Sequence, residues 1–132
     1  MLQSLTIKNI ALIDSLTISL ENGFNVLTGE TGAGKSLIID SLALLLGEKA
    51  DKSLISYGEQ YASVEAVFET NLDSVLNRLE EFGLERENTI IISRKLSIDG
   101  KNECRVNGKS FTLSMLKSIT APLMDLHGQF QH

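Results

Sequence analysis

Residues 29–36 constrain the fold of this chain more than any other part of its sequence. They match the pattern G-x-x-x-x-G-K-[S/T] at every fixed position and read, in order, Gly29, Glu30, Thr31, Gly32, Ala33, Gly34, Lys35 and Ser36. A β-prone segment, residues 24–28, comes directly before them. An apolar segment with helical character, residues 35–46, follows and ends at Gly47. The sequence therefore predicts a strand, a tight glycine-rich loop and a buried helix in direct succession.

This loop has the chemistry of a site for polyphosphate. Glycines at 29, 32 and 34 allow the backbone to bend so tightly that successive N–H groups converge on an anion. The N-terminus of the following helix adds a positive partial charge. Lys35 supplies a full positive charge for the terminal phosphates, and the hydroxyl of Ser36 is a ligand for Mg²⁺. We therefore expect the chain to bind MgATP, with Lys35 acting in catalysis. The sequence has no guanine-reading Asn-Lys-x-Asp motif, although this absence alone does not decide the base.

The remaining hydrophobic patterns predict a mixed α/β domain. Alternating polar and apolar residues predict strands near residues 5–7, 15–20 and 64–69. The first two, together with residues 24–28, form a strand meander that precedes the loop. Two further strands, 89–98 and 103–106, are joined by the turn Asp99-Gly100. Helices are expected at residues 72–82 and 113–119. Pro122 is expected to end the last helix, and residues 123–126 to form a short final strand.

Composition restricts the classes of protein that fit. The formal net charge of −5 gives no independent sign of affinity for the nucleic-acid backbone. Cys104 is the single cysteine, so a disulfide framework within the chain is impossible and a reducing cytoplasm is the expected compartment. The longest apolar block, residues 42–46, is far shorter than a membrane span. We expect a cytoplasmic protein with no membrane partner.

Five segments of the sequence together carry a family resemblance: Leu5-Thr6-Ile7-Lys8-Asn9, the loop with the two residues before it, Ile92-Ser93-Arg94, Cys104-Arg105-Val106-Asn107-Gly108-Lys109 and Asp125-Leu126-His127-Gly128-Gln129. With these segments the chain resembles the bacterial RecN family, DNA double-strand-break repair ATPases that are related to SMC proteins and carry ABC-type heads. The resemblance implies that Gln129 is the Q-loop glutamine, whose amide oxygen helps to hold Mg²⁺ and the attacking water. It also implies that Lys8 and Asn9 lie near the adenine and ribose.

The resemblance further implies how the chain is organised. Residues 1–132 look like the N-terminal lobe of an ABC-type ATPase head, and the family completes this head with a C-terminal half beyond a coiled coil. Neither a Leu-Ser-Gly-Gly signature nor an apolar strand ending in Asp-Glu occurs in the sequence. These 132 residues alone are therefore expected to bind ATP and to hydrolyse it poorly. Expected partners are the C-terminal half of the same head, a second head and, through the full-length protein, DNA, so that the protein gathers at the nucleoid during repair.

Two other functions fit the loop alone. A P-loop small-molecule kinase would need an arginine-bearing lid and an acceptor pocket, and the chain offers only four arginines. A strand meander before the loop is also less typical of such kinases. The second alternative is a non-catalytic assembly module in which ATP only controls dimerisation.

Overall fold

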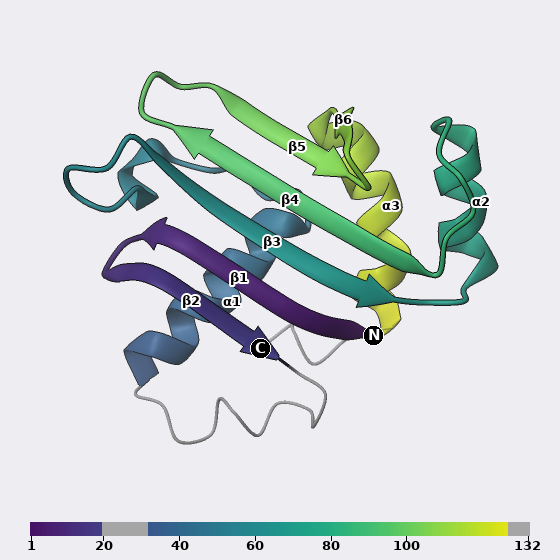
Figure 1. Ribbon diagram of the computed structural model, residues 1–132, viewed down its shortest axis with the longest axis horizontal. Helices are drawn as coiled ribbons and strands as arrows, with labels where there is room; N and C mark the ends of the chain where they lie inside the picture. The colour runs from purple at the N-terminus through teal and green to yellow at the C-terminus, as the bar shows by residue number, and fades with distance from the viewer. Residues whose placement is uncertain (20–31, 127–132) are drawn as a thin grey trace.

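The computed structural model describes residues 1–19 and 32–126, which form a six-stranded antiparallel sheet with helices on one face (Figure 1). The strand order is β2-β1-β3-β4-β5-β6. The strands are β1 (Leu2–Ile10), β2 (Ile13–Ser19), β3 (Tyr61–Glu69), β4 (Thr89–Ser97), β5 (Asn102–Val106) and β6 (Lys109–Phe111). All neighbours pair antiparallel, and among the described strands the pairing of β1 with β3 joins the residues farthest apart in the chain, with Leu5 opposite Ala66.

The helices cover the face of the sheet that carries its apolar side chains. α1 (Gly32–Leu45) and α3 (Leu113–Leu126) cross behind the strands in Figure 1, whereas α2 (Asp73–Glu81) packs against α3 at one end. A short 3₁₀ helix, η2 (Lys52–Leu54), precedes β3. Alternation along the strands sends residues such as Ile7, Val64 and Ile92 into this layer and polar residues to the open face.

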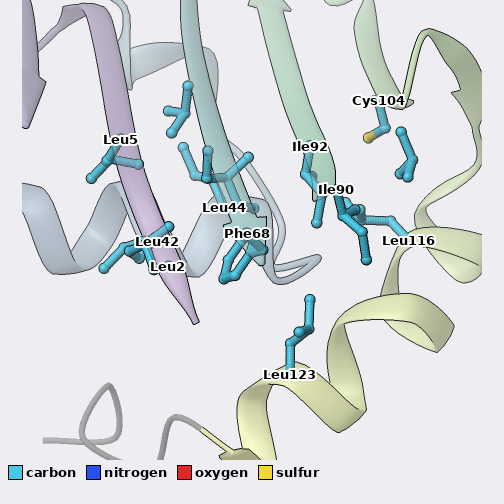
Figure 2. Close-up of a cluster of buried hydrophobic side chains, with 14 of the residues drawn as sticks. Leu2, Leu5, Leu42, Leu44, Phe68, Ile90, Ile92, Cys104, Leu116 and Leu123 are labelled. Carbon is cyan, nitrogen blue, oxygen red and sulfur yellow. The ribbon is translucent and has the colours of Figure 1, made fainter. Parts of the chain in front are cut away.

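One buried apolar cluster joins the sheet to the helices. Figure 2 shows part of it, with Leu42 and Leu44 from α1, Phe68 from β3, and Leu116 and Leu123 from α3. Phe68 is 2% exposed and Leu116 is fully buried, so every layer contributes to the same core. Burial of side chains of this size contributes about 1.5–3 kcal/mol each. The core therefore holds α1 against this face of the sheet.

The structure confirms most of the elements that the sequence predicts. The first strands, α1, α2 and the 89–106 hairpin are present within a few residues of their expected ends, and α3 begins at the expected residue, Leu113. Glycines stop α1 and α2 as expected, since Gly47 has a φ of +97° and Gly83 a φ of +83°. The predicted strand 24–28 and its preceding turn Asn22-Gly23 lie outside the described residues.

The expected end of the last helix at Pro122 is wrong, and so is the expected strand at 123–126. α3 continues through Pro122 to Leu126. The reason is packing: Leu116, Ile119 and Leu123 form one continuous stripe on α3 and are all at most 1% exposed. Burial of Leu123 outweighs the single backbone hydrogen bond that proline removes. The short strand β6 was not predicted; it pairs with β5 after the turn at Asn107-Gly108.

Candidate phosphate-binding site

The helix that follows the glycine-rich loop begins inside the motif itself. α1 starts at Gly32, so Gly32, Ala33, Gly34, Lys35 and Ser36 all lie on its first turns. The first four N–H groups of a helix have no carbonyl partner within the helix and point along its axis toward any bound anion. Gly29, Glu30 and Thr31 of the motif, and Gln129, lie outside the described residues. The described part of the motif is thus the N-terminus of a helix.

α1 is buried on nearly all sides. Ile38, Leu42 and Leu45 are at most 5% exposed, and Ser41, which is 1% exposed, donates its hydroxyl proton to the Leu37 carbonyl at 2.8 Å. Asp40 is the exposed residue on the described part of this helix. A helix enclosed in this way is held by the core rather than by solvent-facing side chains.

The C-terminal end of α1 is held by a buried arginine from the sheet. Arg94 on β4 is 3% exposed, and its Nη1 donates to the carbonyl of Leu44 at 2.9 Å and to the carbonyl of Glu48. Its Nε donates to Oδ1 of Asn102 on β5 at 3.1 Å. Thr120 of α3 donates its hydroxyl proton to the Leu46 carbonyl at 3.3 Å. Carbonyls at the end of α1 thus receive partners from both the sheet and α3.

The sequence alone does not assign Arg94 a role in holding α1; it places this residue only within a family motif. The signal that could have revealed its role is a charged residue at an inward-facing position of a strand, between Ile92 and Leu96. Burial lowers the pKa of the Arg94 guanidinium, and the neighbouring Cys104 acts in the opposite direction. Burial likewise raises the pKa of the Cys104 thiol, which the nearby guanidinium partly offsets. Cys104 is therefore a buried neutral thiol, as expected for an inert cysteine.

Lys8 and Asn9 lie at the end of β1, and the structure gives them different environments. Lys8 is exposed on the open face of the sheet, beside a hollow of about 270 Å³ that Ser63, Lys95 and Glu103 also line. Asn9 has a positive φ of 57°, and its Nδ2 donates to the Tyr61 carbonyl at 3.1 Å. The roles of both residues at the adenine and ribose stay predictions.

Magnesium would be held by residues at the start of α1 and by the segment after α3. The predicted ligands are Ser36 and Gln129, and hydroxyl and amide oxygens together with phosphate oxygens suit this hard cation. Elsewhere in residues 1–19 and 32–126, no group of three or more His, Cys, Asp or Glu side chains could hold a metal ion. No helix in this part of the chain is long and apolar enough to cross a membrane.

Comparison with known families decides what kind of domain this is. The profile of the AAA domain family matches residues 4–127, nearly the whole chain. The chain belongs to the AAA domain family. Within this family, the chain is 46% identical over 133 aligned residues to the DNA repair protein RecN of Bacillus subtilis strain 168. The alignment covers 98% of this chain and 23% of that relative, so the chain spans about a quarter of the length of the RecN protein.

Solved structures give the same fold for this AAA domain. A structure from work on ATP-driven dimerisation and DNA-stimulated activation of SMC ATPases superposes with a TM-score of 0.71 at 25% identity, covering 93% of this chain and 79% of that one. An Smc head domain with a coiled coil and joint, derived from Pyrococcus yayanosii, gives a TM-score of 0.71 at 24% identity and covers 93% of this chain and 25% of the other. The expected fold, an SMC-like head lobe with antiparallel strands before the phosphate loop, is confirmed, as is the resemblance to RecN.

Proposed function

We propose that this chain is the ATP-binding lobe of an SMC-like ATPase head that acts in DNA double-strand-break repair and recombination. The observation that carries the proposal is the complete G-x-x-x-x-G-K-S motif at the start of a buried helix, in a chain 46% identical to a RecN repair protein. ATP is the nucleotide and Mg²⁺ its metal. The domain assignment follows: residues 1–132 form the N-terminal lobe, completed by the C-terminal half of the same head.

In this proposal each part of the loop has a separate task. The backbone N–H groups of residues 29–34 surround the β- and γ-phosphate oxygens. Lys35 neutralises charge that builds up on the γ-phosphate as its bond to the leaving group lengthens. Ser36 and Gln129 hold Mg²⁺, and Gln129 also orients the attacking water. Lys8 and Asn9 contact the base and ribose side of the nucleotide.

Turnover requires more than these residues. Phosphoryl transfer depends mainly on positioning and charge stabilisation, so a partial set of groups gives little rate. The sequence contains neither an Asp-Glu strand end nor a Leu-Ser-Gly-Gly signature. We therefore propose that the 132 residues alone bind MgATP and hydrolyse it slowly, whereas the full-length protein hydrolyses it when two heads meet. Rapid ATP hydrolysis by the isolated 132 residues would contradict this proposal.

Lys35→Ala in the full-length protein tests the assignment. Loss of a charged hydrogen-bond donor costs about 1.5–3 kcal/mol, which is roughly a 10- to 150-fold weaker affinity for MgATP by calorimetry. Lys101→Ala is a matched control, because Lys101 is an exposed lysine in the β4–β5 turn. Unchanged affinity in Lys35→Ala would refute the assignment. Equal losses in both variants would show that general charge, rather than the loop, binds the nucleotide.

The alternatives predict different products and different states. A small-molecule kinase would transfer the γ-phosphate to an acceptor, whereas an ATPase releases inorganic phosphate. A non-catalytic module would dimerise equally with ATP and with a non-hydrolysable analogue and would not release the dimer over time. DNA binding through the full-length protein and a place at the nucleoid are the cellular expectations, which imaging of the tagged protein after DNA damage can check.

A further inference from the structure

Arg94 connects the sheet to the end of α1 opposite the phosphate motif. The helix begins with Gly32 of the motif and ends beside Leu44 and Glu48, whose carbonyls accept hydrogen bonds from Nη1 of Arg94. We propose that Arg94 is a positioning residue that fixes α1 along its axis and so places the phosphate-binding turn. This inference rests on the proposed function and adds a residue that does not touch the nucleotide.

Apolar packing alone does not define the position of α1. Residues at least half buried surround almost the whole circumference of this helix, from Leu37 to Leu46. Hydrophobic contacts are non-directional, so burial of a helix that is apolar on most sides specifies its rotation and axial position less sharply than hydrogen bonds do. Hydrogen bonds to individual carbonyls are directional, and a guanidinium presents its donors in a rigid fork. The contacts from Arg94 thus define the axial position that the core leaves free.

The sheet holds the Arg94 side chain in place on the side away from α1. Asn102 on β5 accepts a hydrogen bond from Nε at 3.1 Å, and Arg94 itself lies in the middle of β4, opposite Cys104. The cationic fork meets the negative end of the helix dipole, so the electrostatic interaction also favours this placement. Because two strands fix the guanidinium, the end of α1 is tied to the sheet rather than to a mobile side chain.

The arrangement is costly for stability, which favours a role in placement. In the part of the chain that the structure describes, Nη2 of Arg94 is the buried side-chain nitrogen that lacks a hydrogen-bond partner. A buried ion is often replaceable by apolar residues of similar volume without loss of stability. Directional contacts to Leu44 and Glu48 are what an apolar residue at this position could not supply.

Displacement at one end of a helix reaches the other end. α1 has 14 residues and is about 21 Å long, and its hydrogen-bonded backbone moves as a unit. A shift at Leu44 therefore appears at Gly32 to Ser36, where N–H groups must meet phosphate oxygens. Misplacement of roughly 1 Å costs on the order of 100-fold in a reacting geometry. Binding of ATP, which needs less accuracy than catalysis, should respond by a smaller factor.

The test compares ATP affinity among variants of the full-length protein at temperatures where each is folded. Arg94→Met keeps the apolar length and removes every donor, and we expect roughly tenfold weaker binding of MgATP by calorimetry. Arg94→Lys keeps the charge and can reach a carbonyl, so it should recover part of the affinity. Leu79→Ala is the matched control: Leu79 is fully buried in α2, which packs mainly on α3. It should lose thermal stability and keep ATP affinity within about twofold of wild type.

The outcomes separate this inference from the proposed function. Wild-type affinity in folded Arg94→Met, or equal losses in Arg94→Met and Leu79→Ala, would overturn the positioning role. If Arg94→Met does not fold, Arg94→Lys and Asn102→Leu decide, because Asn102 is exposed and its loss frees the guanidinium; wild-type affinity in both overturns the inference. Failure of the proposed function looks different, since wild type and Lys35→Ala would then bind MgATP equally.

Discussion

Replacement of Pro122 by alanine should stabilise the chain, because the structure places this proline inside α3. Pro122 has no N–H to donate to the carbonyl of Ser118, four residues earlier, and its ring crowds that carbonyl. Proline costs about 3 kcal/mol relative to alanine in a helix interior. Two effects oppose this gain. Alanine raises the conformational entropy of the unfolded chain, which costs about 0.4–1 kcal/mol of stability. The variant also loses the packing contacts of the half-buried proline ring. A net gain of about 1–2 kcal/mol remains.

Thermal unfolding followed by circular dichroism can measure this gain. An unfolding entropy of ~2.1 cal/mol/K per residue gives ~0.28 kcal/mol/K for 132 residues, so the melting temperature should rise by about 5 °C. Ala121→Gly is the companion variant, because Ala121 is exposed on the same turn; glycine should lower the melting temperature by about 3–4 °C. No rise in Pro122→Ala, together with no fall in Ala121→Gly, would show that α3 ends before Pro122 and would refute the reasoning.

Two smaller predictions follow from other residues of the core and its helix ends. Gly47→Ala should lower the free energy of unfolding more than Gly58→Ala does. Both positions have positive φ, which costs an L-residue roughly 1–2 kcal/mol. At Gly47 the added Cβ would also lie 2.4 Å from Cγ of Lys117, whereas at Gly58 no atom lies within 4 Å of it. Urea unfolding measures both, and equal costs would mean that Lys117 moves aside freely. Because burial raises the pKa of Cys104, the folded chain keeps a thiol proton that the unfolded chain releases, so stability should fall as pH rises above the ordinary value of 9.0. Urea unfolding at about pH 8 and about pH 10 should show a larger decline in wild type than in Cys104→Ala, and equal declines would contradict the shift.

Local patterns predicted the elements of this fold better than their ends. Alternation of period two along β1, β3 and β4 reflects burial of one face, and the face that it assigns is the face that the structure buries. The end of α3 failed because Pro122 is a local signal, whereas burial of Leu123 depends on the fold as a whole. β6 has three residues, too few for a periodic pattern.

In the candidate site, too, local motifs were predictable from the sequence and long-range contacts were not. Residues 29–36 carry their own chemistry, so the sequence alone indicates a phosphate loop, and the start of α1 at Gly32 agrees with it. Arg94 could not be assigned a role in advance, because its partners Leu44 and Glu48 are about fifty residues away in the chain. Lys8, Asn9 and Gln129 depend on the family resemblance for their roles, and those roles stay predictions.

The pairing of β1 with β3 has a consequence for the order in which the molecule assembles. Strands β3 to β6 and the helices α2 and α3 are neighbours in sequence, so they can form early with short closures. Leu5 meets Ala66 only after the intervening chain has closed into a large loop, and that loop contains α1 and the nucleotide motif. We therefore expect competence to bind ATP to develop late during refolding, after most of the sheet has acquired its register.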